Sequence, residues 1–171
     1  MVPLALVPAL LLPLAAGAPP ARGAELYRPL MSAVLRNVDK GGMVVVTTEE
    51  GLQVTLRHRL AETGRCEVTL REELTVGDAP TVVTTRRIGL QDLFPNLLSV
   101  GWPWTYRNDR GALCASIQGS RIFRERADEP PKPEQWLTVC LAEERAALEV
   151  ASFLGAAAVT CGATALQTPG G

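Results

Sequence analysis

LQVTLRHRLAETGRCEVTLR, residues 52–71, alternates apolar and polar side chains on both sides of a short central stretch. Leu52, Val54, Leu56 and His58 share one register of the first half, and Arg57 shares the opposite register with other polar residues. Successive side chains of a β-strand point to opposite faces, so a period of two predicts strands. With a turn over residues 61–64, the stretch predicts an antiparallel hairpin that has one apolar and one charged face.

Further short segments on both sides of this hairpin have the composition of strands and are separated by turn residues. These segments are residues 43–47, 81–87, 112–117, 120–124 and 135–141. No stretch shows the alternation of strands and helices that parallel α/β folds need. The sequence therefore predicts an all-β fold, an antiparallel β-sandwich of about seven to eight short strands with a C-terminal helix.

Three segments give weaker signals. Residues 26–37 have apolar side chains at helical spacing, but Pro29 interrupts the start, so a short helix and an entry strand both fit. Residues 90–98 predict a loop or one short helical turn that ends at Pro95. Residues 128–134 contain three prolines and predict an extended polar connection that cannot be a central strand.

The N-terminus has the pattern of a secretory signal peptide. Residues 1–16 are apolar and carry no charged side chain, and small residues follow at positions that a signal peptidase reads. Cleavage is expected after Gly17 or Gly23. The predicted organisation is therefore a signal peptide over residues 1–23, a β-sandwich domain over residues 24–149, and an apolar segment over residues 150–171.

Four cysteines follow the predicted signal peptide, and they are Cys66, Cys114, Cys140 and Cys161. No two of them have the C-x-x-C spacing of zinc or redox sites, and one histidine is too few to complete a Cys/His zinc set. In an oxidising compartment the default is two disulfides. Four cysteines allow three connectivities, and all three stay open here.

The C-terminal segment allows three interpretations. Residues 142–154 are rich in helix formers, and residues 150–166 contain no charged side chain. A helix or strand packed on the sandwich, a weak membrane span and a glycolipid-anchor signal all fit this pattern. The absence of Lys and Arg after the segment disfavours a membrane span, so packing on the sandwich is preferred.

Composition and motifs exclude several classes of function. The formal net charge of −1 provides no general attraction for nucleic acid. The sequence contains no G-x-S-x-G, P-loop, G-x-G-x-x-G or H-E-x-x-H motif, and its one histidine, His58, is interpreted as structural. Paired acids such as Glu72-Glu73 are interpreted as solvated turns. The sequence thus predicts a non-enzymatic protein with no metal or cofactor.

One aromatic segment is the candidate binding site, in a chain with only 5% aromatic residues. It contains Trp102, Trp104, Tyr106, Arg107 and Arg110. Trp, Tyr and Arg are the side chains that most often anchor interfaces, although the tryptophans could instead plug one end of the sandwich. We expect a secreted or ER-luminal domain that binds a protein or a glycan. The alternative is a luminal subunit or accessory factor of a membrane assembly, associated through residues 150–166.

Overall fold

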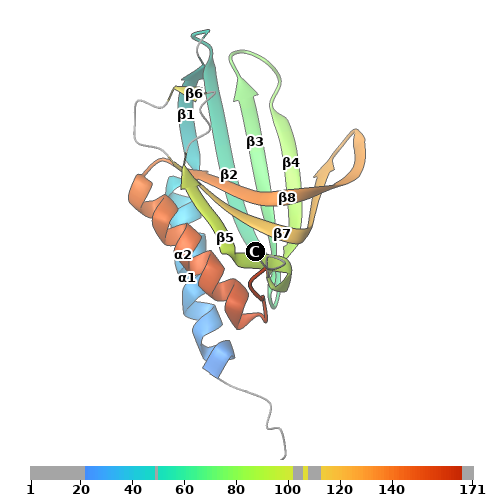
Figure 1. Cartoon of the computed structure of the whole chain (residues 1–171). Helices are drawn as coiled ribbons and strands as arrows, with labels where there is room; N and C mark the ends of the chain where they lie inside the picture. The colour runs from blue at the N-terminus through green and yellow to red at the C-terminus, as the bar shows by residue number, and fades with distance from the viewer. Residues whose placement is uncertain (1–21, 49, 102–105, 108–112, 167–171) are drawn as a thin grey trace, which may run out of the picture.

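The computed structural model describes residues 22–48, 50–101, 106–107 and 113–166, which form one curved antiparallel sheet and two helices (Figure 1). The elements are α1 (Arg22–Gly41), β1 (Met43–Thr48), β2 (Gln53–Gly64), β3 (Glu67–Val76), β4 (Val82–Gly89), the 3-10 turn η1 (Leu90–Asp92), β5 (Leu93–Gly101), β6 (Tyr106–Arg107), β7 (Leu113–Arg126), β8 (Glu129–Leu141) and α2 (Glu144–Thr160). The predicted all-β class, with antiparallel strands and a C-terminal helix, is confirmed.

All eight strands belong to one hydrogen-bonded sheet with the order β5-β7-β4-β3-β2-β1-β6, and β8 pairs with β7. One edge of β7 pairs with β8, while its other edge pairs first with β5 and then with β4. The sheet folds over, and β8 crosses the faces of β2, β3 and β4 (Figure 1). The packing is therefore sandwich-like, although both layers belong to a single sheet that is not closed.

Strand β7 changes direction near Gly119, where its register with β8 shifts. A Cβ at this position would lie 3.0 Å from Leu93 Cδ2 and 3.1 Å from the Asp92 carbonyl oxygen. Before the shift, Ile117 points toward the helices, and after it Ile122 points into the same core. The glycine thus permits the close approach of η1 and β5 at the point where the sheet bends.

The hairpin predicted over residues 52–71 is confirmed as β2 and β3, which pair from Val54↔Val76 to Gly64↔Glu67. The predicted turn at residues 61–64 is wrong, because these residues continue β2. The chain reverses at Arg65 and Cys66, and Cys66 has a positive φ of 64°. Pairing with β3 therefore extends the strand further than the polar residues at its end suggested.

The main core lies between the sheet and the two helices, which pack against each other. On α1 the buried side chains are Tyr27, Met31, Val34 and Val38, at alternating spacings of four and three. This period resolves the choice left open for residues 26–37 in favour of a helix. Pro29 lies inside α1 on its exposed side, so the ring does not enter the core.

Residues 90–98 differ from the expectation, because η1 is followed directly by strand β5. Pro95 is tolerated since, among the described strands, β5 pairs with β7 alone, at an end of the strand order, and its register shifts between Leu93 and Leu98. Residues 128–134 are extended as predicted and mostly belong to β8, whose only strand partner in the described chain is β7. In both cases the prolines lie on strands with a single partner.

The apolar C-terminal segment forms most of α2, which packs against β5, β7 and α1. Its buried residues include Val150, Ala151, Leu154 and Ala158. Among the three interpretations of this segment, the structure shows the helix packed on the sheet. No helix within the described residues combines the length and the apolar composition needed to cross a bilayer.

Candidate functional site

Five charged or titratable side chains from five strands form a connected row inside the sheet, which we call the interior charged chain. Its members are His58 on β2, Glu72 on β3, Arg86 on β4, Glu134 on β8 and Arg124 on β7. His58 Nε2 lies 3.1 Å from Glu72 Oε2, and Arg86 Nη1 lies 3.6 Å from the same oxygen. Arg86 Nε donates to Glu134 Oε2 at 2.7 Å, and Arg124 Nε lies 3.4 Å from Glu134 Oε1.

The strand registers explain why these side chains meet. His58 and Glu72 are direct cross-strand partners, and each continues the inward-facing register of the apolar residues before it on its strand. Glu72 is paired with Thr84, so Arg86 reaches the carboxylate diagonally from the next inward position of β4. Glu134 comes from β8, which crosses these strands, so the interior charged chain joins the two layers of the folded sheet.

Burial determines the electrostatics of this row. The side chains of His58, Arg86 and Glu72 are 1%, 13% and 20% exposed. Burial alone would raise the pKa of Glu72, but the hydrogen bond from His58 and the charge of Arg86 outweigh it and hold the pKa below its ordinary value of 4.5. Within the described residues, His58 Nδ1 and Arg86 Nη1 are buried and have no hydrogen-bond partner.

The Glu72 carboxylate orients His58, as an acid does in the general-base pairs of many enzymes. The second ring nitrogen, Nδ1, is buried and has no hydrogen-bond partner among the described residues. An ionised carboxylate only accepts hydrogen bonds, so His58 donates from Nε2. Through Arg86 and Glu134, the pair links β2, β3 and β4 to the crossing strand β8.

The interpretation of Glu72-Glu73 as a solvated turn is wrong. Both residues lie within β3, where Glu73 faces outward to the exposed Arg71 and Glu72 faces the interior. The missed signal was the period of two, since Val68, Leu70 and Glu72 share one register. His58 is buried, as its position after Leu56 predicted.

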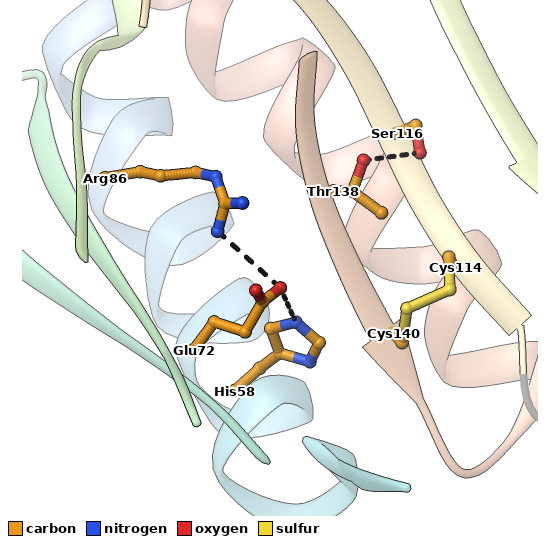
Figure 2. The surroundings of a disulfide bond; sticks show 7 residues. All are labelled: His58, Glu72, Arg86, Cys114, Ser116, Thr138 and Cys140. Carbon is orange, nitrogen blue, oxygen red and sulfur yellow. Dashed lines mark hydrogen bonds and ion pairs between the residues drawn. A yellow bond between two sulfur atoms is a disulfide. The ribbon is translucent and has the colours of Figure 1, made fainter. Parts of the chain in front are cut away.

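All four cysteines form disulfides, and the structure selects the connectivity Cys66–Cys161 and Cys114–Cys140. The first bond joins the turn between β2 and β3 to the end of α2. The second joins paired positions of β7 and β8, and Figure 2 shows it in the same interior as His58, Glu72 and Arg86. Two disulfides are consistent with an oxidising extracellular or luminal environment.

The candidate aromatic segment is only partly within the described residues. Trp102, Trp104 and Arg110 lie outside them. The backbone of Tyr106 and Arg107 forms β6, where these residues pair with Thr48 and Thr47 of β1. Just before the segment, Gly101 pairs with Cys114 of β7, which the second disulfide fixes to β8.

The described strands on either side of residues 102–105 come from the two ends of the strand order. β5 and β6 lie at opposite ends of the strand order, yet only residues 102–105 separate them. A chain extends at most about 3.6 Å per residue, so the end of β5 and the start of β6 are within about 18 Å of each other. The two ends of the strand order therefore lie within this distance of each other where β5 ends and β6 begins.

The chain matches no protein-family model, no curated protein and no solved structure. Its function therefore has to be argued from its own residues. In the part of the chain that the structure describes, no group of three or more His, Cys, Asp or Glu side chains could hold a metal ion.

Proposed function

We propose that this chain is a non-enzymatic binding protein of the extracellular space or the ER lumen, and that it recognises a protein or glycan through its aromatic segment, residues 102–110. One observation carries the proposal: the described residues on either side of the two tryptophans, Gly101 and Tyr106, lie on paired strands at opposite ends of the sheet order. Gly101 is held by β7, and Tyr106 is held by β1. Binding residues are often found on connections that a rigid scaffold positions in this way.

The composition of the segment supports a role in recognition. Trp, Tyr and Arg provide large contact areas together with polar groups, and Trp102 and Trp104 flank a proline. A connection held at both ends loses less conformational entropy on binding than a free loop of the same length. The disulfide between Cys114 and Cys140 strengthens the scaffold at one of these ends.

The proposed location rests on the disulfides and on the sequence of the N-terminus. A cleaved signal peptide would deliver the chain to an oxidising compartment. We favour cleavage after Gly17, because cleavage after Gly23 would remove the start of α1. The alternative role in a membrane assembly, through residues 150–166, gains no support from the contacts, since Val150 and Leu154 are buried in the core.

The test compares the wild-type protein with a Trp102→Ala/Trp104→Ala variant, both produced with their disulfides formed. Each protein is applied to an array of immobilised glycans and to an array of secreted and cell-surface proteins. Any interaction of the wild type is then measured by surface plasmon resonance. We expect the variant to bind at least about tenfold more weakly, which corresponds to a loss of about 1.4 kcal/mol of binding free energy. Residues that anchor an interface typically cost more than this when they are truncated to alanine.

The control is Trp136→Ala, which truncates an exposed tryptophan on β8, outside the segment. It should bind as the wild type does. Urea unfolding is measured for all three proteins, and the double variant should lose less than about 1 kcal/mol of stability. Unchanged binding by the double variant would refute the proposal, and a loss of several kcal/mol in stability would assign the tryptophans to the core.

A further inference from the structure

The outer face of the sheet, opposite the core, has a groove of about 610 Å³ over β3, β4 and β7. Its middle row consists of Thr69, Arg87 and Phe123, which are direct neighbours because Thr69 pairs with Arg87 and Arg87 pairs with Phe123. Groove volumes of about 300–1,000 Å³ are typical of sites for small ligands. The registers of three paired strands therefore fix the spacing of this row.

Phe123 is the feature of the groove that burial in the core does not explain. Its side chain is on the outer face of β7, beside Pro133 of β8, and the residue is 46% exposed. Neighbouring outward positions on β7 are occupied by Arg121 and Glu125. The ring thus provides an apolar surface within a polar surrounding, which is the arrangement of a stacking platform rather than of a core residue.

Two planar polar side chains converge on the end of the groove beside Gly89. A Cβ at this position would lie 2.5 Å from Gln91 Nε2 and 2.8 Å from Asp92 Oδ2, so both groups occupy the space that a side chain at position 89 would take. The Gln91 amide and the Asp92 carboxylate line the groove together with Thr69 and Arg87. Amides, carboxylates and guanidinium groups can each make two hydrogen bonds to neighbouring hydroxyl groups.

The charges in the groove are balanced. Among the lining residues, Glu67 and Asp92 are negative and Arg87 and Arg121 are positive. Arg87 Nε also pairs with Glu125 Oε1 at 3.3 Å, just outside the groove, so the groove has no excess of positive charge. A ligand with several charges of one sign, such as a sulfated chain, would meet as much repulsion as attraction. The balance favours an uncharged ligand that is rich in hydroxyl groups and has one flat apolar face.

We propose that this groove binds a neutral oligosaccharide, with the Phe123 ring stacked on the C–H face of a pyranose. Gln91, Asp92 and Arg87 would hydrogen-bond its hydroxyl groups. The inference goes beyond the proposed function, because it uses none of the residues of the aromatic segment. The two sites can therefore succeed or fail independently.

The experiment uses the full chain with its disulfides formed and titrates it with four neutral β-1,4-linked hexasaccharides. These probes are cellohexaose, chitohexaose, xylohexaose and mannohexaose, and a heparin hexasaccharide serves as the charged comparison. Isothermal titration calorimetry gives each affinity. We expect at least one neutral probe to bind more tightly than the heparin probe.

Phe123→Ala should weaken that binding about tenfold, which corresponds to about 1.4 kcal/mol. Phe123→Trp keeps the stacking surface and should stay within about threefold of the wild type. Gln91→Ala, an exposed substitution that keeps the ring, should weaken binding severalfold and provides a second test if Phe123→Ala folds poorly. The control Trp136→Ala truncates an exposed aromatic residue that does not line the groove, and should change nothing.

Three results would overturn the inference: binding of none of the neutral probes, preference for the heparin probe, or full binding by both Phe123→Ala and Gln91→Ala. Trp102→Ala/Trp104→Ala distinguishes the two proposals. If this variant keeps sugar binding, the groove acts independently of the aromatic segment. If this variant loses sugar binding while Phe123→Ala and Gln91→Ala keep it, the sugar site is the aromatic segment. The groove proposal is then wrong, while the proposed function stands.

Discussion

Glu72→Gln removes the negative charge that His58 and Arg86 share in the interior, while it keeps the size of the side chain. A hydrogen bond to a charged group contributes about 1.5–3 kcal/mol, and breaking a buried ion pair costs about 3–5 kcal/mol. Glu72 is 20% exposed, and Arg86 keeps its 2.7 Å bond to Glu134. We therefore expect a loss near the lower end of these ranges, about 2 kcal/mol at pH 7.

The loss should depend on pH in a definite direction. The pKa of Glu72 is lowered in the folded protein from its ordinary value of 4.5, so its ionised form stabilises the fold above that pH. As the pH falls through the folded pKa, the carboxylate takes up a proton and this contribution disappears. The stability difference between the wild type and Glu72→Gln should therefore be full at pH 7 and shrink below pH 4.5. The acids Glu129 and Glu149 also have lowered pKa values, but both proteins contain them, so they cancel in the difference.

The assay is urea unfolding followed by circular dichroism between pH 7 and pH 3, with stability extrapolated to water. The matched control is Glu73→Gln, which changes the next residue of the same strand but faces outward to the exposed Arg71. Its cost should be below about 0.5 kcal/mol at every pH. Equal costs for the two variants, or a difference that stays constant across this range, would refute the assignment of Glu72 to the interior charged chain.

Two further predictions concern the C-terminal helix. Cys66→Ala/Cys161→Ala removes a disulfide that spans 95 residues, and loop entropy predicts a loss of about 4–5 kcal/mol in the free energy of unfolding. Urea unfolding measures this loss, and an unchanged stability would mean that the wild type does not form this disulfide. Leu154→Ala should cost about 2–5 kcal/mol in the same assay, because Leu154 is buried against the sheet, whereas the exposed Leu148→Ala on the same helix should cost less than about 0.5 kcal/mol. Similar costs for the two leucines would mean that α2 does not pack as described.

The hairpin of β2 and β3 could be predicted because a period of two over many residues has few alternative explanations. Strand β5 could not be predicted, because Pro95 is a strong loop signal. A proline is compatible with a strand that pairs on one side, and the sequence does not reveal that β5 lies at an end of the described strand order. Helix α1 is ambiguous in the sequence because Pro29 interrupts its start, whereas Tyr27, Met31 and Val34 share one helical face that the core covers. In each case tertiary pairing or packing decided between structures that local sequence allowed.

The interior charged chain was harder to predict than the fold. His58 and Glu72 could have been assigned inward from their registers, but Arg86 and Glu134 meet only because β8 crosses over β4. The disulfide connectivity has the same origin, since Cys66 and Cys161 are brought together by the position of α2 on the sheet. Such contacts depend on how the sheet bends, and the bend near Gly119 leaves little trace in the local sequence.

The contact between α1 and α2 also determines when this chain can fold. Helix α1 precedes the strands of the sheet and α2 follows them, so a ribosome has synthesised the described sheet before the second helix exists. Until then, the apolar side of α1 and the inner side of the sheet lack their partner, and folding rates fall as contacts become more distant in sequence. A chain synthesised only as far as β8 therefore exposes apolar surface that α2 covers in the complete fold. Helix α2 is thus the element that completes the main core, and the core cannot close before it is made.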